Sequence, residues 1–532
     1  MSLARNVLVQ TGFTLGSRVL GFARDLALNA RFGGQGPLMD AWGTAQMLPN
    51  FFRRLFAEGA FAQAFVPSYA KTLEVEGKQA AQKLASDVMA VILTAVTVIV
   101  IAFEVAMPWI MPVFLQAYIN EPDVMSTAVL MAQLAMPYLV AMTLASLLSG
   151  VLNTFGRFAL TAGAPILLNI CTIIPPLVIE DQRTAALLAS LAVTIAGVLQ
   201  VILLWWGVRR LGVSLSAGLP VVNRGVRKVI ALAVPGAIAG GALQINTLVT
   251  QYLSGSDKGA RAVLYNSERL YQLPLGLIGV AVGIALVPRL TRHFADADRS
   301  GSDRTMDDGL VLAMAFTVPA TIAFLIMPYV VIDATMTRGA FTSDDALRTA
   351  EVLRAFSWGI PAFVLAKVFA PAYFARQRTK QPMQFALITV VANIILGATL
   401  WYWLPTQGVD GAIGLGWATS AASWLNVFLL AGTLAAEGVY VVGGRAWLKL
   451  ARLGLASAVM GGFVALAAAN YEMLSNILLA KELAVIAIAL CGFVIYLLAA
   501  FMLGAVRVSE ITGALRRDRA TKADDLPSSS PD

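Results

Sequence analysis

Apolar segments of about 20 residues recur along almost the whole chain, and no other feature constrains its fold as much. A helix needs about 20 apolar residues to cross the hydrocarbon core of a bilayer. Lipid offers no hydrogen-bond partners to the backbone, so a chain of such segments spans the membrane as helices. At 58% hydrophobic and 13% charged residues, the 532-residue chain also lies outside the soluble globular class. The sequence therefore predicts an all-α polytopic membrane protein.

Counting the apolar segments between polar breaks predicts about fourteen transmembrane helices. They are expected at residues 5–31, 38–69, 84–111, 126–152, 158–179, 185–208, 227–253, 263–290, 307–333, 347–373, 382–404, 410–436, 447–470 and 481–505.

Lysine and arginine are distributed unequally between the two sets of connecting segments. One set carries about 24 cations and the other about 7, and cytoplasmic loops are the cation-rich ones. Both termini are therefore predicted to be cytoplasmic. These loops account for the net charge of +8, which removes the argument for a nucleic-acid partner. The cation-poor, extracytoplasmic set is expected to hold Arg31, Arg183, Lys258, Arg261, Arg338, Arg348 and Lys481.

Three sequence matches at nearly one offset indicate an internal repeat. Pro137 and Pro361 are 224 residues apart, as are Asn169 and Asn393, and the Leu-Pro pairs ending at Pro49 and Pro274 are 225 apart. The offset spans six helices, so both copies should enter the membrane in the same direction. The repeat predicts two pseudo-twofold six-helix lobes and an extra C-terminal helix pair. The expected boundaries are 1–215, 220–437 and 445–506, followed by a disordered cytoplasmic tail over 507–532.

The two predicted helices at 5–31 and 38–69 carry charges that apolar segments normally exclude. A charge at the bilayer centre costs about 3 kcal/mol even on the lenient insertion scale, so a functional role is the default interpretation. Glycines in the first helix and Pro49 in the second predict bent helices, which line cavities. We interpret this pair as one wall of a water-filled cationic cavity that holds an anionic substrate inside the membrane.

Four arginines are the candidate substrate ligands because each lies a turn or more inside an apolar segment. A guanidinium binds a phosphate through two parallel, charge-assisted hydrogen bonds, so four converging arginines would suit a diphosphate. An alternative role for such arginines is a structural ion pair or a position at the membrane interface. The four candidates are Arg18, Arg24, Arg53 and Arg269.

The acidic residues near these arginines have two interpretations. Asp40, Glu58 and Glu268 either neutralise the arginines or form gating pairs that separate when the pathway opens. Glu58 follows Arg54 by four residues and should pair with it on a helix. Asp25 is next to Arg24 in sequence and is expected to be a structural charge partner.

The repeated asparagines, Asn169 and Asn393, also have two interpretations. They cap or cross-link helices, or they bind a coupling ion. No other cofactor or metal is predicted. The single histidine, His293, lies in a basic loop, and the sequence has no Walker A loop, HExxH motif or GxSxG motif with partners. These observations argue against an enzyme and against an ATP-driven pump on this chain alone.

Three strings carry a family resemblance that extends over essentially the whole chain: SRVLGFARD from Ser17, DAWGTAQMLPNFFRRLFAEGAFAQAFVP from Asp40, and ERLYQLPLGLIGVAVG from Glu268. Together they closely resemble the MurJ (MviN) lipid II flippases of the multidrug/oligosaccharidyl-lipid/polysaccharide exporter superfamily. The family often has Asp at the position of Glu268.

The resemblance implies transport of the undecaprenyl-diphosphate-linked peptidoglycan precursor from the inner to the outer leaflet of the bacterial cytoplasmic membrane by alternating access. It implies that Arg18, Arg24, Arg53 and Arg269 are required, and that the C-terminal helix pair forms a groove for the lipid tail. Membrane lipids and other cell-wall synthesis proteins are the implied partners. Membrane potential, sodium and protons all stay open as energy sources.

Other functions fit some of the same residues. The chain could move another polyprenyl-linked oligosaccharide, or it could be an efflux antiporter, although cationic drugs would favour an acid-lined cavity. A membrane-embedded transferase acting on polyprenyl phosphates would need a catalytic acid or base at the interface. A non-transporting scaffold for cell-wall enzymes would leave the buried arginines unexplained.

Overall fold

The computed structural model describes residues 3–54, 60–216, 218–272, 274–275, 290 and 299–505. Its α-helices are α1 (Leu3–Phe32), α2 (Pro37–Ala45), α3 (Met47–Phe52), α4 (Ala60–Val75), α5 (Lys78–Phe114), α6 (Pro122–Ala135), α7 (Tyr138–Thr154), α8 (Phe158–Val178), α9 (Gln182–Arg210), α10 (Arg224–Ser254), α12 (Arg299–Ile326), α13 (Pro328–Met336), α14 (Ser343–Ser357), α15 (Ile360–Ala375), α16 (Lys380–Trp403), α17 (Gly411–Ala436), α18 (Gly444–Ala469), α19 (Tyr471–Ile477) and α20 (Lys481–Met502).

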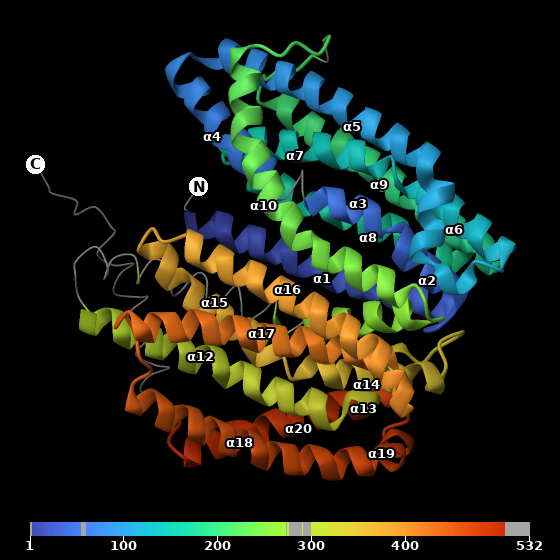
Figure 1. Ribbon diagram of the computed structural model, residues 1–532, viewed down its shortest axis with the longest axis vertical. Helices are drawn as coiled ribbons and strands as arrows, with labels where there is room; N and C mark the ends of the chain where they lie inside the picture. The colour runs from blue at the N-terminus through green and yellow to red at the C-terminus, as the bar shows by residue number, and fades with distance from the viewer. Residues whose placement is uncertain are drawn as a thin grey trace, which may run out of the picture. The chain divides into compact units, whose positions relative to one another are not determined.

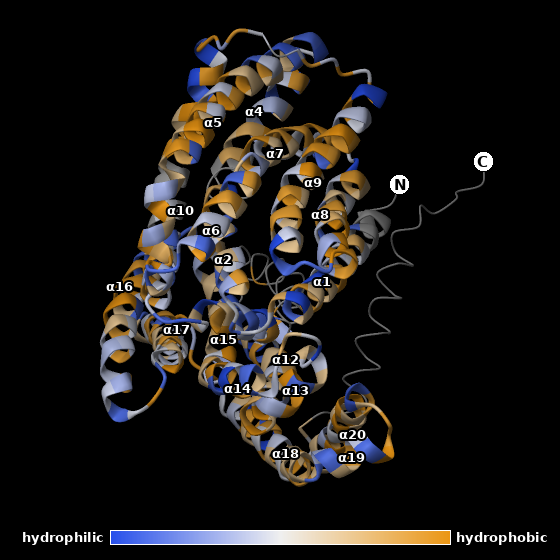
Figure 2. Cartoon of the chain, turned by 90° about the vertical axis from the view of Figure 1, so that its right-hand side faces the viewer, coloured by the Kyte–Doolittle hydropathy of each residue, from blue (hydrophilic) through white to orange (hydrophobic). Residues whose placement is uncertain are grey.

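Residues 260–272 are also helical, and short 3-10 helices cover Gln116–Tyr118 and Leu404–Gln407. The described part of the chain contains no β-strand. Ten of its helical stretches are long and apolar enough to cross a membrane. Hydrophobic residues cover the long α5 and α9, and hydrophilic residues gather near helix ends (Figure 2). The predicted all-α polytopic class is confirmed, and the count of fourteen spans stays a prediction.

Several segments predicted as single helices are interrupted. The segment at 38–69 is broken at Gln46 and takes a π-helical form at residues 53–54, which agrees with the bend predicted from Pro49. Proline has no N–H for the helical ladder. The segments at 126–152 and 347–373 are each divided near the repeated prolines, between α6 and α7 and between α14 and α15. The two breaks support the internal repeat.

The chain forms two compact units, each with its own core. The first contains residues 1–269, 335–352 and 390–418, and the second contains 270–334, 353–389 and 419–532. In the first unit, α8 packs against α1 and α9, and α7 packs against α9 (Figure 1). Small residues such as Ala132, Ala189 and Ala196 are fully buried there and allow close helix approach.

In the second unit, α18 packs against α12 and α20 (Figure 1). The predicted C-terminal helix pair is therefore present as α18 and α20. Asp333 of α13 is buried, accepts a hydrogen bond from Tyr471 over 3.0 Å and pairs with Lys481 over 2.9 Å. These bonds hold the connection between α18 and α20 against α13. The role of this pair as a lipid-tail groove stays a prediction.

Helix packing at Gly197 of α9 generates a stability prediction. A Cβ atom at Gly197 would lie 2.7 Å from the Tyr138 ring and 2.9 Å from the Ala141 Cβ, whereas a Cβ at Gly454 of α18 meets nothing within 4 Å. Gly197→Ala should therefore destabilise the protein by about 1–3 kcal/mol through overpacking. Gly454→Ala should be neutral or stabilise it, since alanine is the better helix former. Thermal unfolding in detergent checks both variants, and equal shifts of the two midpoints would contradict the packing described.

Candidate functional site

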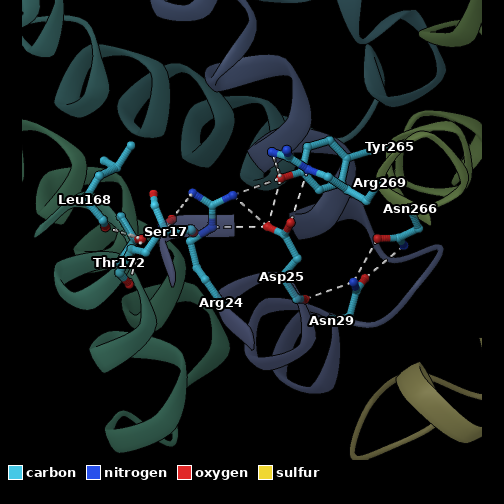
Figure 3. A network of polar contacts seen from close by, with 10 residues as sticks. Ser17, Arg24, Asp25, Asn29, Leu168, Thr172, Tyr265, Asn266 and Arg269 are labelled. Carbon is cyan, nitrogen blue, oxygen red and sulfur yellow. Dashed lines mark hydrogen bonds and ion pairs between the residues drawn. The ribbon is translucent and has the colours of Figure 1, made fainter. Parts of the chain in front are cut away.

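A buried carboxylate on α1 is shared by two of the four candidate arginines (Figure 3). Asp25 Oδ1 accepts hydrogen bonds from Arg24 Nη2 at 2.8 Å and from Arg24 Nε at 3.1 Å. Asp25 Oδ2 pairs with Arg269 Nε at 3.1 Å. Asp25 is almost completely buried, as a charge with two cationic partners can be. Asp25 thus pairs with Arg24, its neighbour in sequence, and Arg269 is an additional partner. Its role as a structural charge partner stays a prediction.

Tyr265 completes this cluster. Its hydroxyl donates to Asp25 Oδ1 over 3.0 Å and accepts from Arg269 Nη2 over 2.9 Å and from Arg24 Nη2 over 3.4 Å. The Arg269 guanidinium also lies over the Tyr265 ring, 4.9 Å from its centroid. Tyr265 precedes Arg269 by four residues, and this spacing on a helix face was the available signal for a residue that the sequence analysis missed.

Two asparagines join the same helices one turn further along. Asn29 and Asn266 exchange a pair of hydrogen bonds of 2.8 and 2.9 Å, and both are fully buried (Figure 3). Asn29 also donates to the Asp25 carbonyl over 2.9 Å. The two amides satisfy each other, so they fix α1 against the helix at residues 260–272 without leaving a buried polar group unpaired.

The repeated asparagines cross-link equivalent helices, as predicted. Asn169 of α8 accepts from Arg24 Nη1 over 3.2 Å and donates to the Ser17 carbonyl over 2.8 Å, both on α1. Asn393 of α16 donates to Asn246 of α10 over 2.9 Å. Each therefore bonds the first helix of its own repeat copy. The alternative of a coupling ion stays open.

The other two candidate ligands lie apart from this cluster. Arg18 is exposed on α1 and has no hydrogen bond or ion pair with any residue described in the structure. It shares no pair with Asp25. Arg53 is half-buried at the π-helical turn and donates to Asn50 Oδ1 over 3.3 Å. The structure thus joins Arg24 with Arg269 and leaves the common diphosphate site of all four arginines a prediction.

In the described part of the chain, the hydrogen-bond partners of Asp40 are two backbone amides and a tyrosine hydroxyl. Asp40 is buried and accepts from the Gly259 amide over 2.6 Å, the Ala262 amide over 2.8 Å and the Tyr118 hydroxyl over 2.9 Å. The first amides of a helix have no partner within it, so a carboxylate satisfies them and their partial positive charge. Asp40 therefore caps the helix that carries Glu268 and Arg269.

Of the two candidate glutamates, Glu268 lies within the described residues and Glu58 lies outside them. Glu268 is half-buried, and Arg54, Arg261 and Arg269 are the cations that act on it electrostatically. Arg54 also donates to Gln244 over 3.4 Å. Glu58, and with it the predicted Arg54–Glu58 pair, lies outside the described residues, as do His293 and the tail at 507–532.

The capping role of Asp40 generates a prediction with a matched control. Asp181 also caps a helix, but it is exposed and accepts from one amide, that of Thr184. Asp40→Ala should lower the free energy of unfolding by at least about 2 kcal/mol, because it leaves three buried donors unpaired. Asp181→Ala should cost about 1 kcal/mol or less. Unfolding midpoints and hydrogen exchange over residues 260–272 measure the difference. Equal costs, or unchanged exchange there, would exclude the capping role.

Comparison with known proteins gives one consistent family. A family model described as "Lipid II flippase MurJ" matches residues 29–483. The probable lipid II flippase MurJ of Rhizobium tropici is 35% identical over 533 residues, covering 99% of this chain and 99% of that protein. The probable lipid II flippase MurJ of Rhizobium meliloti (strain 1021) is 33% identical over 529 residues, covering 97% of each.

Solved structures share the fold. A lipid II flippase MurJ in an inward closed conformation matches with a TM-score of 0.75 at 24% identity, covering 93% of this chain and 98% of that one. An inward-facing MATE family multidrug transporter of the MOP superfamily matches with a TM-score of 0.63 at 12% identity, covering 81% and 98%.

Proposed function

The chain belongs to the MurJ family of lipid II flippases, and from this premise we propose that it moves lipid II from the inner to the outer leaflet of the cytoplasmic membrane. The observation that carries the proposal beyond the family match is the sharing of Asp25 by Arg24 and Arg269. Two guanidinium groups and one carboxylate leave a net positive charge among membrane-spanning helices. An anionic headgroup would compensate that charge.

The diphosphate of the precursor is the chemical group that this cluster suits. Arg24 and Arg269 present planar forks, which can each form two parallel bonds to phosphate oxygens. Both currently bond to Asp25 and Tyr265, and a diphosphate would replace these acceptors with more negative ones. Arg18, exposed and one to two turns before Arg24 on α1, and Arg53 would extend the site along the headgroup.

Alternating access would carry this headgroup across without exposing it to hydrocarbon. Asp25, Asp40, Glu58 and Glu268 would exchange partners during the cycle, because a gate needs charges that pair when the pathway is shut and separate when it is open. The polyprenyl tail would lie in lipid or along α18 and α20, and both termini would face the cytoplasm. In this proposal the chain transports and carries out no catalysis.

The leaflet on which the precursor accumulates tests this function. Depleting the protein should trap lipid II in the inner leaflet, and the wild-type chain should reverse this. Arg24→Ala and Arg269→Ala should fail to reverse it, because each removes one of the two guanidinium groups that would bind the diphosphate. Arg210→Ala is the matched control, since Arg210 stacks on Trp206 at 3.9 Å from the ring centroid and has no part in the cluster.

The alternatives give different results. An unchanged leaflet distribution after depletion would favour a scaffold, and loss of the lipid-linked product itself would favour a transferase. Accumulation of a different polyprenyl-linked oligosaccharide would identify another substrate of the same class.

A further inference from the structure

Arg348 of α14 bonds to three other chain segments. Its Nε donates to Asp410 Oδ2 over 2.5 Å, and its Nη2 forms an ion pair with Asp257. Its Nη1 donates to Gln35 Oε1 over 3.0 Å and to the Lys258 carbonyl over 2.8 Å. Each of its three nitrogens is thus engaged. These five residues, Arg348, Gln35, Asp257, Lys258 and Asp410, are called the Arg348 hub below.

The hub joins parts of the chain that are far apart in sequence. Gln35 connects α1 to α2, Asp257 and Lys258 lie between α10 and the helix at 260–272, and Asp410 directly precedes α17. All of these connections belong to the cation-poor set, which the positive-inside rule assigns to the extracytoplasmic face. The hub therefore ties early and late parts of the first unit together at one predicted face.

Backbone hydrogen bonds beside the hub also join the end of α1 to the segment that contains Arg348. The Ala340 amide donates to the Ala30 carbonyl over 2.8 Å, and the Gly34 amide donates to Asp345 Oδ2 over 3.1 Å. Gly33 has a φ of +80°, and a Cβ there would lie 3.1 Å from the Ala340 carbonyl oxygen. The end of α1 thus meets the segment before α14 almost backbone to backbone, which leaves little space for solute to pass between them.

The hub can separate without unfolding a helix. Its bonds are made by side chains and by one carbonyl in a connecting segment, so helical backbone ladders stay intact when they break. The Arg348 side chain is 20% exposed and that of Asp257 is 48% exposed. Water can therefore hydrate the separated charges, which is the condition for a reversible ionic contact.

We propose that Arg348 is a gating residue: the hub holds the predicted extracytoplasmic end of the first unit closed, and transport requires its bonds to break. The inference rests on the proposed function for its place in a transport cycle. Removing the guanidinium should then shift the population toward the extracytoplasmically open state.

Thiol labelling from outside intact cells tests this shift. Cys171→Ser and Cys491→Ser remove the two native thiols, which are free. Gln244→Cys places a reporter beside Arg54, to which Gln244 is bonded. With Arg348→Ala, a membrane-impermeant thiol reagent should label the reporter about tenfold faster than in the Arg348 parent, because losing the hub shifts the two-state equilibrium toward the open state. Arg348→Lys should be intermediate, because an ammonium cannot replace the planar fork.

Arg376→Ala is the matched control. Arg376 also pairs with a carboxylate, that of Glu437 at 3.0 Å, but its connection belongs to the cation-rich, predicted cytoplasmic set. Its removal should leave labelling from outside at the parent rate. Asp257→Asn should raise labelling by less than Arg348→Ala, since it removes one bond of the hub.

A reversible covalent lock provides a second measurement. The Cβ position of Gly33 lies 3.9 Å from the Ala340 Cβ, within the range of about 3.5–4.5 Å that a disulfide needs. Oxidised Gly33→Cys/Ala340→Cys protein should stop moving lipid II between leaflets, and reduction should restore movement. Gly33→Cys alone controls for the strain of a side chain at a positive φ.

Parent-rate labelling in folded Arg348→Ala, or transport by the oxidised double-cysteine protein, would overturn the gating role. If Arg348→Ala does not fold, the covalent lock decides. Labelling requires no substrate, so a failed leaflet experiment with faster labelling in Arg348→Ala would overturn the proposed function and leave the hub as the closure of this end.

Discussion

A charge among apolar helices needs a polar partner, and in this protein two guanidinium groups share one carboxylate. Asp25 accepts from Arg24 and Arg269, and Tyr265 accepts from the same two arginines while donating to Asp25. The arrangement is stable without substrate because every buried partner has an acceptor or donor. It also leaves one positive charge uncompensated. A polyanion is therefore attracted to a site whose ligands are already held in place, which reduces the ordering that binding would require.

The two helices that carry this cluster, α1 and the helix at 260–272, are also next to the Arg348 hub, because Gln35 follows α1 and Lys258 precedes residue 260. Three positions along α1 and the connection after it are linked to residues 255–269. Asp25 pairs with Arg269, and Asn29 bonds to Asn266. Gln35 is linked through Arg348, which also bonds to the Lys258 carbonyl. A diphosphate that draws Arg269 away from Asp25 would weaken the first of these three links and leave the bond between Tyr265 and Asp25. Under the two proposals above, substrate binding and opening are then coupled through one pair of helices, and the coupling is reciprocal by linkage.

The sequence reveals the parts of the site that depend on local rules. Charges inside apolar segments identify Arg24 and Arg269, and the repeat identifies Asn169 and Asn393 as cross-links. Tyr265 could also be predicted, because it precedes Arg269 by four residues and therefore lies on the same helix face. The backbone partners of Asp40 could not be predicted, because the amides of Gly259 and Ala262 are about 220 residues away in sequence and offer no side-chain signal. Counting apolar segments also does not show the helix breaks near Gln46 and near the repeated prolines. The residues on both sides of each break are apolar, so their mean hydropathy does not fall at the break.

The difference between the predicted lobes and the observed units has a physical reason. The sequence repeat compares two similar halves of the chain, so it places the boundary between the lobes near residue 220. Contacts report which segments are bonded in one conformation, and residues 335–352 and 390–418 belong with residues 1–269. The bonds that bring them there include those of Arg348, the Ala340–Ala30 contact and the Asn393–Asn246 bond. The first two lie at the predicted extracytoplasmic end, which is where an alternating-access cycle has to open. The unit to which residues 335–352 and 390–418 belong would therefore change with conformation. The sequence repeat would not change. The predicted lobes and the observed units are thus compatible in a protein that exchanges contacts during transport.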